Sequence, residues 1–80
     1  MNLVTFNLNC IATVKLSELG LKAFLGYRRK HGLFGVFNER DNTFRTQVWE
    51  LMMIFGPVIY HGAEMSPFID NEITVDLESV

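Results

Sequence analysis

A two-residue alternation near the start of the chain constrains the fold more than any other feature of this sequence. Between residues 4 and 16, apolar side chains occupy the even positions and mostly polar ones occupy the odd positions, with Ile11 as the exception. This period is typical of a β-strand that buries one face and exposes the other. A strand of this length is expected to contain a bend or bulge. The apolar positions are Val4, Phe6, Leu8, Cys10, Ala12, Val14 and Leu16.

The end of the chain alternates in the same way. Ile73, Val75 and Leu77 are separated by polar or acidic residues, which predicts a second strand with one exposed face. We expect the two terminal strands to pair antiparallel. Because a lone pair of strands is marginally stable, the middle of the chain should add one or two short strands, with residues 33–37 as a candidate. Residues 58–62 fit either a brief strand or a loop.

The first of two helices is predicted directly after the N-terminal strand. Ser17 is a good N-cap, and Gly32 is a good residue for the position just past the helix end. Between them, Leu21, Phe24 and Leu25 share one helical face. The helix should therefore run from about residue 18 to residues 27–30.

A second helix is predicted to follow the polar loop 38–42, with Asp41 or Thr43 as its cap and Gly56-Pro57 as its end. Its polar arc contains Glu50. Its expected buried stripe consists of Phe44, Val48, Leu51, Met52 and Phe55. The sequence thus predicts an α+β fold: a small antiparallel sheet with two helices packed on one face.

Length and composition favour one folded domain spanning 1–80. The chain has 80 residues, of which 49% are hydrophobic and 20% charged, unlike a disordered segment. It contains no apolar run long enough to span a membrane and no basic secretory start. The single cysteine, Cys10, cannot form an internal disulfide. We therefore expect a cytoplasmic protein with no membrane association.

Side chains suited to catalysis or metal binding are few. Cys10 falls on the buried face of the first strand, where a thiol behaves as a small apolar group. His61 with Glu64 offers only two neighbouring metal ligands, fewer than a protein site needs. Gly32 and Gly35 lack the lysine and hydroxyl residue of a phosphate loop. The sequence predicts a non-enzymatic protein without metal or cofactor.

Charge is distributed unevenly along the chain. All seven basic residues lie in 1–45, whereas 46–80 contains six acids and no base. The asymmetry fits either an interaction surface or two halves that neutralise each other. The run Arg28-Arg29-Lys30, with Arg40 and Arg45 nearby and aromatic neighbours at Tyr27 and Phe34, makes a small nucleic-acid-binding module the alternative function.

One observation weighs against that alternative, and another suggests a third possibility. The net charge is −2, which is opposite to the usual signature of nucleic-acid binding. Glu72, Asp76 and Glu78 would line one face of the final strand, as in a nucleic-acid mimic, although the basic first half argues against mimicry.

The predicted second helix is apolar around much of its circumference. Trp49 and Met53 lie off its main stripe, one turn apart, and Arg45 is expected one turn before Trp49. Tryptophan and methionine are enriched in interface cores. These residues are therefore either covered by the first helix or form a face for a partner or a second copy of the chain.

Three stretches resemble a known group of proteins. They are 12–20, which begins Ala-Thr-Val-Lys-Leu, 47–57, which ends Phe-Gly-Pro, and 67–73. Together they resemble small accessory proteins of tailed phages and prophages of enteric bacteria. The resemblance implies a phage product in the host cytoplasm that binds a host protein, with bacterial defence systems among the implied targets.

Overall fold

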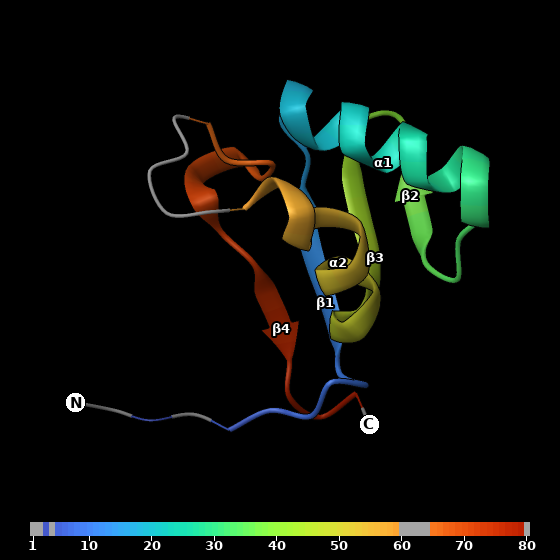
Figure 1. Ribbon diagram of the computed structural model, residues 1–80. Helices are drawn as coiled ribbons and strands as arrows, with labels where there is room; N and C mark the ends of the chain where they lie inside the picture. The colour runs from blue at the N-terminus through green and yellow to red at the C-terminus, as the bar shows by residue number, and fades with distance from the viewer. Residues whose placement is uncertain (1–2, 4, 60–64, 80) are drawn as a thin grey trace.

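The computed structural model describes residues 3, 5–59 and 65–79. Its elements form the order β-α-β-β-α-β, with two short 3₁₀ turns, η1 and η2, in the second half (Figure 1). The elements are β1 (Ile11–Lys15), α1 (Glu18–His31), β2 (Val36–Asn38), β3 (Thr43–Gln47), α2 (Val48–Phe55), η1 (Gly56–Val58), η2 (Ile69–Asn71) and β4 (Thr74–Asp76).

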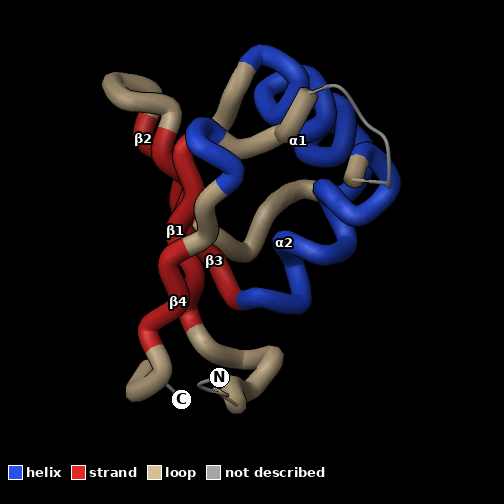
Figure 2. The backbone as a smooth tube through the Cα atoms, turned by 90° about the vertical axis from the view of Figure 1, so that its left-hand side faces the viewer, coloured by secondary structure: helices blue, strands red, loops and turns tan. Residues whose placement is uncertain are grey.

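The four strands form one antiparallel sheet in the order β2-β3-β1-β4. Both helices lie on the same face of that sheet, and the opposite face is open (Figure 2). The predicted α+β fold is confirmed, as is the pairing of the terminal strands, in which Ala12 lies opposite Val75. This is the split β-α-β arrangement of ferredoxin-like domains, which serves many unrelated functions.

A row of four phenylalanines forms the centre of the core between the sheet and the helices. Phe44 of β3 lies 5.0 Å from Phe24 of α1 and 6.4 Å from Phe55 of α2, measured between ring centroids. Phe68 packs on Phe55 at 5.0 Å. Edge-to-face contacts of this kind add to the stabilisation that comes from buried area. The row connects α1, the sheet, α2 and the segment before β4.

The caps of α1 are those predicted. The Ser17 side chain accepts a hydrogen bond from the Gly20 N–H at 3.2 Å. At the other end Gly32 has a φ of +73° and donates its N–H to the Arg28 carbonyl. The predicted apolar face is correct for Phe24, which is buried, and wrong for Leu25, which is 51% exposed.

Two glycines in α1 have opposite surroundings and predict opposite mutational effects. A Cβ at Gly20 would collide with the Pro67 carbonyl oxygen, whereas a Cβ at Gly26 would meet no atom within 4 Å. We expect Gly20→Ala to lower the melting temperature, because the backbone of 67 must move. We expect Gly26→Ala to raise the free energy of unfolding by up to about 1 kcal/mol, the helix preference of alanine over glycine. Thermal melts of both variants check this, and destabilisation by Gly26→Ala would contradict the open surroundings.

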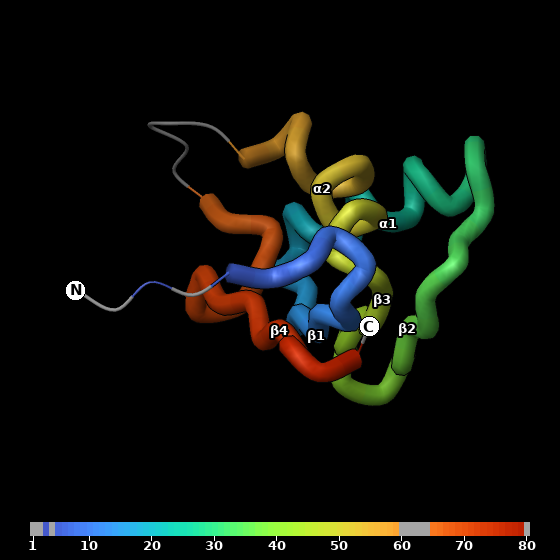
Figure 3. The backbone as a smooth tube through the Cα atoms, turned by 90° about the horizontal axis from the view of Figure 1, so that it is seen from below, coloured from blue at the N-terminus to red at the C-terminus, as the bar shows by residue number. Residues whose placement is uncertain are grey.

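The N-terminal strand is shorter than the alternation predicts. β1 begins at Ile11, since the preceding residues turn: Cys10 donates its N–H to the Asn7 carbonyl, and the Asn7 side chain accepts from the Asn9 N–H. This segment then crosses the lower end of the molecule, where the Leu8 carbonyl accepts from the Trp49 N–H at the start of α2 (Figure 3). Val4 lies outside the described residues.

Residues 43–47 are a strand, so the predicted start of the second helix is wrong. β3 pairs with β1 on one side and with β2 on the other, which places Phe44 opposite both Val14 and Phe37. Two ladders of backbone hydrogen bonds outweigh the helical spacing of Phe44 and Val48. The Asp41 side chain accepts from the Thr43 N–H in the hairpin turn instead of capping a helix.

The buried side of α2 is rotated from the predicted stripe. Val48, Leu51 and Phe55 are buried as expected, but Met52 is 60% exposed and Ile54 is buried instead. Glu50, predicted on the polar arc, has no exposed surface. The helix is only eight residues long, and both the sheet and α1 contact it, so its buried arc turns toward both.

Three of the remaining predictions for the chain are confirmed, two of them with shifted bounds. α2 ends at Phe55, before Gly56-Pro57, and Val58 completes a 3₁₀ turn. The predicted strand or loop at 58–62 lies mostly outside the described residues. The predicted short middle strand is β2, which spans Val36–Asn38 instead of 33–37. β4 covers only Thr74–Asp76 of the predicted 73–77.

Candidate functional site

A buried carboxylate holds the segment between α1 and β2 against the start of α2. Glu50 accepts three hydrogen bonds, from the Phe34 N–H at 3.1 Å, from the Gly35 N–H at 3.1 Å and from the Thr46 hydroxyl at 2.6 Å. A buried polar side chain is stable in a core only when hydrogen bonds of this kind satisfy it. The carboxylate thus fixes two consecutive backbone amides of a segment that has no regular structure.

Gly35 fixes the same segment from the other side. A Cβ at this position would collide with the Thr46 side chain and the Arg45 carbonyl oxygen, so the backbone of 35 lies directly on β3. Only glycine allows this approach without displacing the strand. The backbone at 34–35 is therefore held both by Glu50 and by its packing against β3.

The side chain presented by this segment is a phenylalanine in solvent. Phe34 is 83% exposed, and its ring packs against Trp49, with 5.6 Å between the centroids and 59° between the planes. The Trp49 indole N–H donates to Gln47 Oε1 at 2.6 Å, which fixes the orientation of the half-buried indole. An exposed phenylalanine and a half-buried tryptophan thus pack together, one from the segment before β2 and the other from α2.

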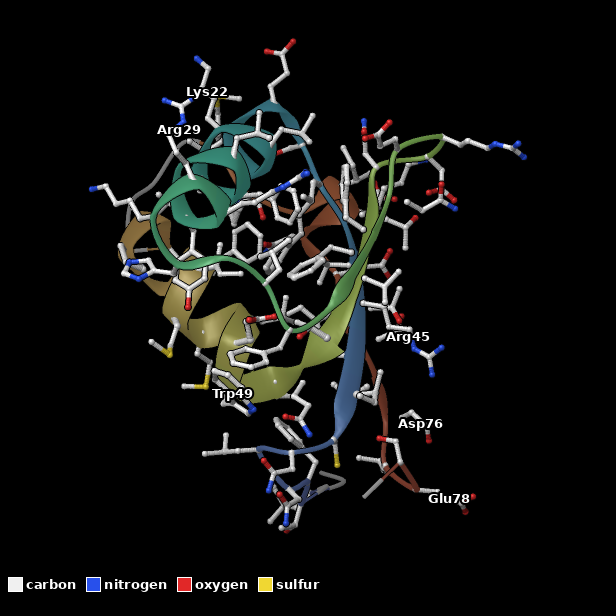
Figure 4. The ribbon with its side chains drawn as sticks, turned by 90° about the vertical axis from the view of Figure 1, so that its right-hand side faces the viewer. Lys22, Arg29, Arg45, Trp49, Asp76 and Glu78 are labelled. Carbon is white, nitrogen blue, oxygen red and sulfur yellow. The ribbon has the colours of Figure 1, made fainter. Side chains whose placement is uncertain are left out.

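The predicted partner-binding residues do not share one helical face. Trp49 and Met53 lie on the solvent side of α2, where Met53 is 58% exposed. Arg45, predicted one turn before Trp49, belongs to β3 and projects from the open face of the sheet (Figure 4). This correction follows from the strand conformation of 43–47. Phe34 lies between Trp49 and Arg45. Its ring packs on Trp49, and it also lines a hollow of about 340 Å³ together with Val36 and Arg45.

We call this region the Phe34 surface. It consists of Phe34, Val36, Trp49 and Met53, with Arg45 at its border. Sequence reasoning missed Phe34, Gly35 and Glu50 as parts of one arrangement. The one available signal was Glu50 itself, the sole charged residue in the otherwise apolar stretch 48–55.

The basic residues of the nucleic-acid alternative are spread over separate faces. Arg28, Arg29 and Lys30 are all exposed in the last turn of α1, where they complement the helix dipole. Figure 4 shows Arg29 on the outer side of α1 and Arg45 on the opposite side of the molecule. The aromatic neighbours are also engaged elsewhere: Tyr27 packs on His31 at 4.7 Å, and Phe34 packs on Trp49.

The C-terminal acids do not form the predicted single strand row. Glu72, Asp76 and Glu78 are all exposed, but only Asp76 lies within β4. Glu78 lies in the turn that follows, where its N–H donates to Asp76 Oδ1. The spacing expected of a phosphate mimic is therefore absent from this strand.

Residues suited to chemistry are dispersed. Cys10 is buried, with Sγ 4.0 Å from the Leu77 carbonyl oxygen. Among residues 3, 5–59 and 65–79, no three His, Cys, Asp or Glu side chains gather as metal ligands, and the predicted pair His61 and Glu64 lies outside these ranges. Hydrogen bonding to Thr43 lowers the pKa of Asp41, an exposed turn residue; any stability it contributes is lost as the pH falls through that lowered pKa.

Comparison with protein-family models, curated proteins and solved structures finds no match to this chain. Within the described part of the chain, no helix is both long and apolar enough to cross a bilayer.

Proposed function

We propose that this chain is a non-enzymatic protein-binding module that docks on its partner through the Phe34 surface. The observation that carries the proposal is the 83% exposed Phe34 ring, held in solvent by the buried Glu50 carboxylate. Exposing a large ring to water is unfavourable, by roughly 25 cal/mol per Å² of apolar surface. Burial of the Phe34 ring against a partner protein would explain why the fold holds this ring in solvent.

The Phe34 surface has the composition of an interface centre. In protein–protein interfaces, aromatic residues, methionine and arginine are enriched at the centre. A few buried aromatic side chains contribute most of the binding energy. Because Glu50 and Gly35 order the backbone before binding, less conformational entropy is lost on association.

The partner we propose is a bacterial host protein, met in the host cytoplasm. This part of the proposal is supported by the resemblance of 12–20, 47–57 and 67–73 to phage accessory proteins. Inhibition of a bacterial defence system is the specific activity that the resemblance favours. A homodimer formed through the same surface is the alternative occupant.

Removal of the two rings tests the proposal. We expect the double variant Phe34→Ala, Trp49→Ala to remain folded and to bind its partner at least 30-fold more weakly, since a hot-spot residue contributes about 2 kcal/mol or more. Affinity capture from bacterial lysate with quantitative mass spectrometry measures this loss. Leu25→Ala is the matched control, because Leu25 is an exposed apolar residue on α1.

The outcomes are distinct. Proteins captured by wild type and by Leu25→Ala but lost with the double variant would support the proposal. Undiminished capture by the double variant would contradict it. Sedimentation that shows a wild-type dimer and a monomeric double variant would identify a second copy as the occupant. Binding should also shift the emission of Trp49, the only indole, to shorter wavelength.

A further inference from the structure

The inner face of β4 is only partly covered by helix. α2 has eight residues and so spans about 12 Å. It lies over the centre of the sheet, and β4 stands to one side of it (Figure 1). An apolar groove of about 500 Å³ remains on the helix side of the sheet, next to β4. Its lining includes Phe6, Leu51, Met52 and Phe68, and on the β4 side Ile73 and Val75.

β4 is also an edge strand. One side of it pairs with β1, and no other described strand pairs with its outer side. The backbone N–H and C=O groups on such an edge can bind a further extended chain. Proteins use this geometry to recognise peptides by strand addition, with pockets that select alternate side chains. The β4 edge and the groove together provide both features.

The two faces of β4 differ in chemistry. Ile73 and Val75 line the groove on the helix side. Glu72 and Thr74 instead line a hollow of about 260 Å³ on the open face of the sheet, together with a second acid, Asp70, and one base, Lys15. Asp76, two residues beyond Thr74, points away from the helices, and Glu78 lies close by (Figure 4). A peptide strand added beside β4 would thus place every second one of its side chains over the apolar groove. Its remaining side chains would lie beside the acidic residues on the open face.

We propose that the β4 edge binds an extended peptide segment in which apolar and basic residues alternate. The apolar residues enter the groove, and the basic residues lie beside Glu72 and Asp76. Opposite charges on neighbouring strands stabilise the pairing of those strands. This site is separate from the Phe34 surface and does not depend on the function proposed above.

Other occupants fit the chemistry less well. Two copies joined through their β4 edges would bring Glu72 and Asp76 of one copy next to the same acids of the other, and like charges across strands are destabilising. Among the described residues that line the groove, a fatty acid would find no polar side chain to bind its carboxylate. The acids beside β4 would also repel that carboxylate. Charge complementarity therefore selects a basic strand.

A capped seven-residue peptide of alternating valine and lysine, carrying a fluorescent label, is the probe. We expect saturable binding measured by fluorescence anisotropy, with backbone amide shifts at 72–77 in NMR spectra. The same peptide with glutamate in place of lysine should bind at least tenfold more weakly. N-methylation of alternate residues should also reduce binding at least tenfold, because it removes edge hydrogen bonds.

Charge reversal on the protein is the decisive variant. Glu72→Lys with Asp76→Lys should reverse the preference, so that the glutamate peptide binds more tightly than the lysine peptide. Both side chains are exposed, so folding should be retained. Glu39→Lys at the distant β2–β3 turn is the matched control and should leave the preference for the lysine peptide unchanged.

Several results would overturn the proposal: no binding of the lysine peptide at millimolar concentration, an unchanged preference after charge reversal, shifts centred on Phe34, or a homodimer joined at β4. Phe34→Ala should leave peptide affinity unchanged. Failure at the β4 edge is therefore distinguishable from failure of the Phe34 surface, which is measured by capture of the protein partner.

Discussion

Replacement of Phe55 by alanine is expected to lower the free energy of unfolding by about 3–5 kcal/mol, the usual cost of truncating a buried phenylalanine. Phe55 is fully buried and joins two neighbours in the aromatic row, Phe44 and Phe68. A domain of this size has a total stability of about 4–12 kcal/mol. The variant should therefore lose a large share of its stability and unfold at a much lower urea concentration than the wild type, as measured by urea denaturation followed by circular dichroism.

Met52→Ala is the informative control for this prediction. The helical spacing in the sequence groups Met52 with Phe55, whereas the structure leaves Met52 60% exposed. We expect Met52→Ala to change the free energy of unfolding by no more than about 0.5 kcal/mol, as surface substitutions usually do. A cost equal to that of Phe55→Ala would mean that the buried arc of α2 is the one predicted from spacing.

Replacement of Glu50 by alanine is expected to be about as damaging as the loss of Phe55. It removes the acceptor of the Phe34 N–H, the Gly35 N–H and the Thr46 hydroxyl. A buried donor left without a partner costs about 1–3 kcal/mol, so the loss of all three partners is expected to cost at least about 3 kcal/mol. Glu50→Gln keeps one acceptor oxygen and should cost about 1–3 kcal/mol. Urea denaturation of both variants measures the two values.

A local readout separates the role of Glu50 in the Phe34 surface from its role in general stability. Amide hydrogen exchange at Phe34 and Gly35 should accelerate more in Glu50→Gln than exchange in β1 does. Glu39→Ala, which removes an exposed acid, should change neither stability nor exchange. If exchange at 34–35 were unaffected in Glu50→Gln, the carboxylate would not be what orders the exposed ring.

The two proposed surfaces lie on different parts of the fold and select different chemistry. The Phe34 surface presents ordered aromatic rings next to the start of α2. The β4 edge offers unpaired backbone groups, an apolar groove and acids on the opposite face. Since the sites share no residue, variants of one serve as controls for the other. Together they would allow one small domain to hold two partners, or two parts of one partner.

Local signals in the sequence determined the terminal strands, the first helix and the end of the second. Alternation around Ala12 and Val75 depends only on which side chains face the core, so it is visible without knowledge of the fold. The same holds for the capping of α1 by Ser17 and Gly32, since a cap acts on backbone groups within four residues.

Only the tertiary structure decided the conformation of 43–47 and the assembly of the Phe34 surface. Helical spacing predicted a helix through Phe44, but pairing with two strands distant in sequence made this segment β3. Glu50 read as a polar helix residue because two of its three donors, the N–H groups of Phe34 and Gly35, lie 16 and 15 residues away in the chain. The physical reason is the same in both cases. The deciding hydrogen bonds are made between segments that only the folded chain brings together, and no local pattern encodes them.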